Sequence, residues 1–83
     1  MGMNVHAYAS AKDYGAVTPS DTTVLQFDAI YVGGAGDLAI SPTEGGSDAV
    51  TLTGVTAGSI IPIRGKRVMS TNTTATTLTW LQW

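Results

Sequence analysis

Short runs of β-branched and apolar residues, separated by glycine-rich segments, follow one another from Phe27 to Trp83. Val, Ile, Thr, Tyr and Trp fit the pleated surface of a sheet, and Gly interrupts it, so each run predicts one β-strand. The predicted strands are Ala29 to Gly34, Gly36 to Ser41, Ala49 to Gly54, Ser59 to Gly65, Lys66 to Ser70 and Thr76 to Trp83.

Glycine and asparagine mark the predicted reversals of the chain. Gly33 to Asp37 lies between two apolar runs and supplies residues that tolerate positive φ, so Ile30 to Ile40 is predicted to form a hairpin. Glu44 to Asp48 has the same chemistry and predicts the next reversal. Asn72 predicts a turn within a Thr-rich stretch. The fold class that follows is all-β, a small antiparallel β-sandwich or a jelly-roll-like barrel.

The first 26 residues have a different composition. They are rich in Ala, Ser, Thr and Gly, their apolar residues are scattered, and Pro19-Ser20-Asp21 is a turn signal. A helix over Ala7 to Lys12 would be too short to be stable alone in water. We therefore predict an extended N-terminal arm over residues 1–26 and a β-structured domain over residues 27–83.

Apolar residues are predicted on both faces of several strands. In the last strand Leu78 and Trp80 point to one face and Leu81 and Trp83 to the other, because side chains alternate across a sheet. Burying a large apolar side chain stabilises a fold by about 1.5–3 kcal/mol, which is large against the stability of a small domain. Contacts with other subunits are the predicted cover for the second face. The alternative is a monomer in which a two-sheet sandwich and the folded-back arm cover both faces.

Composition narrows the function classes. The 83 residues include no Cys and a single histidine, His6, which predicts no disulfide, no metal site and no cofactor. A net charge of −2 with 12% charged residues gives no positive field for nucleic acid. No segment is long and apolar enough to span a membrane, so no membrane partner is expected.

Patterns that resemble enzyme motifs lack the surroundings that their chemistry requires. Gly34 to Ala39 matches a dinucleotide-binding fingerprint, but Pro42 prevents the helix that would hold the pyrophosphate. The carboxylates are scattered over loops and turns, without the spacing of a Ca²⁺ loop or an acid/base pair. No nucleophile motif is present. We therefore predict no catalytic residues and no enzymatic activity.

Two groups of residues are candidates for protein contacts. Aromatic and aliphatic anchors carry much of the energy of an interface, and cations fix orientation. Three of the four cations stand within four positions, without interleaved aromatic residues, which favours a solvated strand edge or ion pairs between subunits over a nucleic-acid site. The predicted interface residues are Tyr31, Arg64, Lys66, Arg67, Trp80, Leu81 and Trp83.

Four segments carry a resemblance to a known family. They are Val17 to Thr23, Ala29 to Asp37, Ala57 to Ile63 and Arg67 to Thr76. In these segments the chain resembles the small spike-base attachment proteins of tailed bacteriophages and related gene-transfer agents. The resemblance spans most of the chain from Val17 onward and rests on turn and strand sequences without catalytic residues. It implies a β-rich virion component seated on the capsid or at the base of a spike or fibre.

The expected function is therefore that of a structural bacteriophage virion protein. It would act as a capsid decoration or spike- or fibre-base attachment subunit, by self-assembly and by docking on the shell. Its expected partners are copies of itself, as a homo-oligomer, and a major capsid protein or a spike or fibre protein. Its expected location is the virion, after assembly in the host cytoplasm. The alternative function is a carbohydrate-binding or host-adhesion module, in which exposed aromatic rings would stack on sugars.

Overall fold

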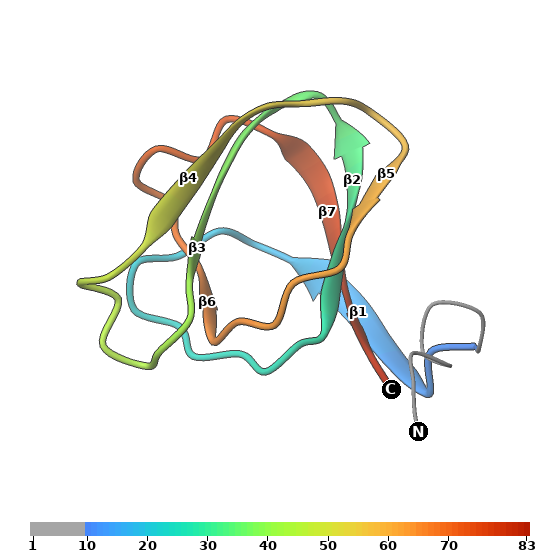
Figure 1. Ribbon diagram of the computed structural model, residues 1–83, viewed down its shortest axis with the longest axis horizontal. Coiled ribbons are helices and arrows are strands. Elements are labelled where there is room, and N and C mark those ends of the chain that lie inside the picture. The colour runs from blue at the N-terminus through green and yellow to red at the C-terminus, as the bar shows by residue number, and fades with distance from the viewer. Residues whose placement is uncertain (1–9) are drawn as a thin grey trace.

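The computed structural model describes residues 10–83, which form β-strands and no helix (Figure 1). The all-β class predicted from the sequence is confirmed. The strands are β1 (Asp13–Val17), β2 (Ala29–Gly34), β3 (Gly36–Ser41), β4 (Val50–Val55), β5 (Ser59–Ile61), β6 (Arg67–Val68) and β7 (Thr76–Gln82).

The strands form two antiparallel sheets that face each other (Figure 1). One sheet has four strands in the order β1-β7-β2-β5, and the other has three in the order β4-β3-β6. The chain passes between the sheets at four places, between β2 and β3, between β4 and β5, between β5 and β6 and between β6 and β7. Each of these strand pairs therefore contributes one strand to each sheet.

The pairing continues across the place where the chain changes sheets. Ile30 pairs with Ile61 in the four-stranded sheet, and Ile40 pairs with Val50 in the three-stranded sheet. Between them the register shifts by one residue at a β-bulge, where Gly54 has a φ of +69° and its N–H donates to Asp37 Oδ1 at 3.0 Å. A bulge bends a strand and increases its twist. The molecule is thus a strongly curved sheet folded on itself, intermediate between a sandwich and a barrel.

The hairpin predicted over Ile30 to Ile40 is wrong, because β2 and β3 belong to different sheets and do not pair. The glycines there permit close approach of another strand instead of a reversal. A Cβ atom at Gly34 would lie 2.0 Å from Thr76 Oγ1, and one at Gly36 would lie 2.5 Å from the backbone nitrogen of Ala75. Glycine is therefore required where the bent β2–β3 segment crosses the start of β7.

The other two predicted reversals are present. Glu44 to Asp48 lies in the loop that joins the paired strands β3 and β4, with Gly46 at a φ of +79°. Asn72 lies in a turn with a φ of +70°, a conformation that Asn tolerates better than most residues.

The fifth strand is shorter than predicted. It ends at Ile61, directly before Pro62, whereas the sequence predicted a strand to Gly65. Proline has no N–H for a ladder hydrogen bond and so ends the pairing. Beyond it a single bridge, Phe27 with Gly65, connects the chain before β2 to the chain before β6.

Strand β1 lies inside the segment that the sequence predicts as an arm. All five of its residues pair with β7, so this part of residues 1–26 belongs to the four-stranded sheet. Strand β7 pairs with β2 along one edge, and β1 covers its other edge. A domain boundary at residue 26 stays a prediction. Residues 1–9, including His6, lie outside the described residues.

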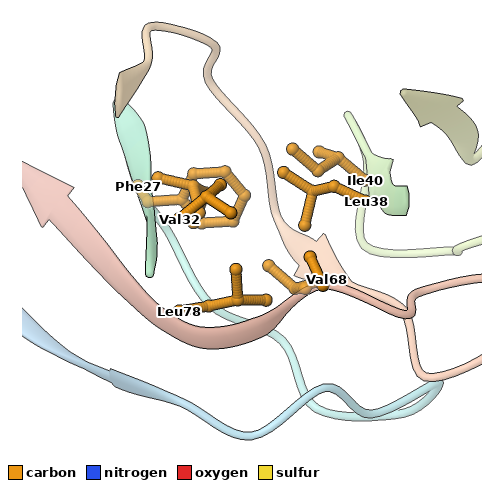
Figure 2. Packing of buried hydrophobic residues seen from close by; sticks show 8 residues of the cluster. Phe27, Val32, Leu38, Ile40, Val68 and Leu78 are labelled. Carbon is orange, nitrogen blue, oxygen red and sulfur yellow. The ribbon is translucent and has the colours of Figure 1, made fainter. Parts of the chain in front are cut away.

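The core lies between the two sheets (Figure 2). Phe27, Val32, Leu38, Ile40, Val68 and Leu78 point toward one another there, from both sheets and from the segment before β2. All are at most 3% exposed. Ile30 completes this layer and is fully buried. The inner face of the four-stranded sheet is therefore the face of Ile30, Val32 and Leu78.

Candidate interaction surface

The opposite face of the four-stranded sheet carries a second apolar surface, which we call the outer face. Directly paired residues of an antiparallel sheet project on the same side. One row crosses all four strands and contains Ala16, Thr79, Tyr31 and Ile60. The neighbouring row contains Tyr14, Leu81 and Ala29, of which Ala29 is buried. These seven uncharged residues define the outer face.

Large side chains of the outer face are exposed. Tyr14 is 69% exposed, Ile60 56% and Tyr31 38%. They stand on β1, β5 and β2, so the apolar surface extends from one edge strand of the sheet to the other. Single exposed apolar residues are ordinary, whereas an uncharged group spread over a whole sheet is typical of a surface that binds another protein. The outer face is the candidate interaction surface.

Two of the predicted aromatic and aliphatic anchors lie on this surface. Tyr31 stands in the middle strand β2, and Leu81 is half-buried on β7. Trp80 points to the inner face and packs against the core cluster. Its indole lies over Gly15, at which a Cβ would be 2.7 Å from Trp80 Nε1. Trp80 therefore stabilises the fold, and its role as an interface residue stays a prediction without support from its position.

Trp83 follows the end of β7 and is half-buried. Its backbone N–H donates to Asp28 Oδ2 at 2.9 Å, and the other oxygen of that carboxylate, Oδ1, lies 3.4 Å from Arg64 Nε. Asp28 thus connects the C-terminal residue to the chain between β5 and β6. The Arg64 side chain is 80% exposed, so it remains accessible to a partner while this ion pair is formed.

The three predicted cations do not form one patch. Arg67 projects from β6 away from the core residue Val68 and is half-buried. Its Nη1 atom donates to the backbone oxygen of Asp21. Lys66 is half-buried, and its backbone N–H donates to the backbone oxygen of Ser41 at 2.8 Å. Only Arg64 among the three is both charged and widely exposed.

Asp21 fixes the loop before β2 onto the turn after β6. Its Oδ1 atom accepts the N–H groups of Ser70 and Thr71, each at 2.9 Å, and its Oδ2 atom accepts the Thr71 hydroxyl at 2.5 Å. These hydrogen bonds, chiefly those of Thr71, lower the pKa of the Asp21 carboxyl. Hydrogen bonds from Thr43 and then Ser41 likewise lower the pKa of Asp48 in the β3–β4 loop. Both carboxylates have a structural task, as expected for turn aspartates.

Other kinds of site find little support in residues 10–83. No three carboxylate or imidazole side chains in this range gather closely enough to hold a metal ion. The range also contains no helix that could cross a membrane.

A shallow apolar groove lies at the open side between the two sheets, lined by Ile40, Pro42, Val50, Leu52, Ile63 and Arg64.

The sequence did not single out Tyr14 and Ile60 as contact residues. Tyr14 falls in the predicted arm, where no strand was expected, so it had no assigned face. Ile60 falls in a run of apolar residues, and alternation indicated that such a run has two apolar faces. Alternation alone does not say which face is buried, because that depends on where the second sheet packs.

No family model and no curated protein matches the chain. One solved structure does match, the capsid of a native gene-transfer-agent (GTA) particle computed with C5 symmetry. The two chains are 35% identical with a TM-score of 0.77, and the match covers 96% of this chain and 100% of the capsid chain. This chain belongs to the family of that GTA capsid chain. It is a structural protein of a phage-like virion.

Proposed function

We propose that this protein is a capsid decoration or a spike- or fibre-base attachment subunit, which docks on the shell through the outer face of its four-stranded sheet. Membership of a family with a chain in a GTA capsid supports a place in the particle. The observation that carries the docking surface is the uncharged outer face, with Tyr14, Tyr31 and Ile60 exposed on three different strands. Its expected partners are a major capsid protein, a spike or fibre protein, and copies of itself.

The exposed charge of Arg64 fits this proposal. It stands within the segment between β5 and β6 and pairs with Asp28, while its side chain is 80% exposed. Apolar anchors supply binding energy at an interface, while charges at its rim mainly set orientation and association rate. Arg64 is therefore the cation that we expect to orient the docked subunit.

Binding to particles that lack this protein tests the proposal. We expect the purified chain to co-sediment with such particles, and Ile60→Lys to reduce binding at least tenfold because it puts a charge in the apolar face. Val24→Lys is the matched control, since Val24 is 46% exposed and lies in a loop away from the outer face. Equal loss in both variants, or unchanged binding of Ile60→Lys, would contradict the proposed docking surface.

A second candidate function is glycan binding, because Tyr14 and Tyr31 expose two aromatic rings on one face. Sugar sites combine such rings with polar groups that fix the hydroxyls, and the outer face between the two tyrosines consists of Ala16, Thr79 and Leu81. A glycan array with the folded protein separates the two functions. Binding to assembled particles without glycan binding favours docking, and the reverse result favours adhesion.

A further inference from the structure

Strand β4 has one unpaired edge. It pairs with β3 on one side, and within residues 10–83 no segment pairs with its other side. The edge of β6 is covered in contrast, since the Ser20 N–H donates to the Val68 oxygen at 2.9 Å and the Leu25 N–H to the Lys66 oxygen at 2.6 Å. A free edge presents backbone donors and acceptors that a further strand can satisfy.

This edge lacks the side chains that usually prevent such pairing. Edge strands are commonly protected by Lys, by other charges or by Pro. No residue from Ala49 to Ile61 is charged or a proline, and the strand itself reads VTLTGV. Its protection is limited to the bulge opposite Asp37, which bends the strand beyond Thr53.

The free edge lies beside the apolar groove. Val50 and Leu52 of β4 line that groove, and Ile63 lines its other side. Val50 is 60% exposed and Ile63 37% exposed. The one charge at its rim, Arg64, already pairs with Asp28 of the same chain. The groove therefore favours an uncharged, apolar strand as its occupant.

The bulge determines which register a second strand can adopt. Regular pairing of β4 with β3 runs from Val50 to Leu52, and the register breaks beyond Leu52. Two identical antiparallel segments overlap fully when their central residues lie opposite each other. For this regular segment the central residue is Thr51, which places Val50 opposite Leu52 of the second copy on the groove side. In this register Asp48 does not face its own counterpart, and its oxygens accept hydrogen bonds from Thr43 and Ser41.

We propose that a second copy of this chain adds its β4 to this edge, antiparallel and around a two-fold axis at Thr51. The uncharged strand is complementary to itself, and each copy places Val50 and Leu52 against the groove of the other. The two three-stranded sheets then form one six-stranded sheet. This interface supplies the self-association in the function proposed above, on which it rests, and leaves the outer face available for the shell.

The absence of cysteine allows a direct test of the register. Thr51 and Thr53 both point away from the core face that carries Leu52. In the Thr51→Cys variant the two new thiols would face each other, and mild oxidation should give a covalent dimer. In the Thr53→Cys control the two thiols would be four residues apart, about 13 Å, which is too far for a disulfide.

We expect the disulfide-linked fraction on a non-reducing gel to be at least tenfold higher for Thr51→Cys than for Thr53→Cys. In a second measurement, Val50→Lys should raise the dimer dissociation constant at least tenfold in analytical ultracentrifugation, and Val24→Lys should not change it. Equal cross-linking at both positions, cross-linking at neither, or an unchanged dissociation constant for Val50→Lys overturns the proposal.

These results are independent of docking on the shell. Both measurements use the isolated protein, whereas the Ile60→Lys test uses particles. If edge pairing fails while Ile60→Lys still loses particle binding, the dimer proposal is wrong and the proposed function stands. If Thr51→Cys cross-links while Ile60→Lys binds particles normally, the edge interface stands and the docking surface is wrong.

Discussion

Trp80 covers Gly15, the residue directly opposite it in the ladder between β7 and β1. Three indole atoms lie within 3.0 Å of the position that a Cβ at Gly15 would occupy. The indole thus lies across the backbone of β1 and reaches the core cluster from the edge of the sheet. This contact attaches the first strand to the rest of the fold.

Gly15→Ala should therefore destabilise the protein. The added methyl group must displace the indole, and overpacking of this kind costs about 1–3 kcal/mol. The free energy of unfolding, measured by urea titration, checks this value. Gly45→Ala is the control, because a Cβ there meets nothing closer than Thr43 Oγ1 at 3.8 Å. A Gly15→Ala variant as stable as the Gly45→Ala variant would show that Trp80 is not held against β1.

Trp80 and Tyr31 should respond differently to truncation. Trp80→Ala removes a large side chain packed on the core and should lower the free energy of unfolding by about 3 kcal/mol. Tyr31→Ala should change it by less than about 1 kcal/mol, because the ring is exposed on the outer face. It should instead weaken particle binding by more than about 1 kcal/mol. Urea titration and co-sedimentation measure the two effects, and a reversal of this pattern would exchange the two roles.

Local sequence signals predicted the strands well. The ranges of β2 and β3 agree residue by residue with the prediction, because alternation of apolar residues and interruption by glycine act within a few positions. Pairing was harder to predict. Gly33 to Asp37 has the composition of a hairpin turn, but Gly34 and Gly36 are needed where Thr76 and Ala75 of a distant segment approach. A sequence read alone does not distinguish a turn glycine from a contact glycine.

The sequence predicted only part of the candidate interaction surface, again because local patterns carry no information on tertiary contacts. Alternation correctly separated Trp80 from Leu81 in β7, and Ile30 from Tyr31 in β2. It did not tell which of the two faces the second sheet covers. Tyr14 was missed because β1 has little β-propensity apart from Tyr14 and Val17 and forms a strand by pairing with β7. Tertiary pairing, and not local preference, places it on the outer face.

The two arginines of the predicted contact cluster should differ in their effect on stability. Arg67→Ser removes the guanidinium that donates to the Asp21 backbone oxygen and should lower the unfolding free energy by about 1–3 kcal/mol. Arg64→Ser should change it by less than about 1 kcal/mol, since an exposed ion pair contributes little. Thermal and urea unfolding measure both. If Arg64→Ser were the more destabilising variant, the Asp28 ion pair and not the Asp21 loop would be the structural contact.

Asp21 should make stability depend on pH. Hydrogen bonds from Thr71 and Ser70 lower its pKa in the folded state below the ordinary value of 3.8. The stabilisation is therefore complete above about pH 4 and is lost as the pH falls through the lower folded pKa. NMR titration of the carboxyl carbon should give a pKa below 3.8. Asp21→Asn should be less stable than the wild type at pH 7, with a smaller difference at pH 2; a difference that grows toward pH 2 would contradict this assignment.

Electron microscopy of the particle that contains this protein would show directly whether the outer face docks on the shell. We expect density for the two-sheet fold at the shell, with Tyr14, Tyr31 and Ile60 buried against a capsid, spike or fibre protein. Particles that lack this density, or density in which the outer face of the four-stranded sheet is turned to solvent, would contradict it.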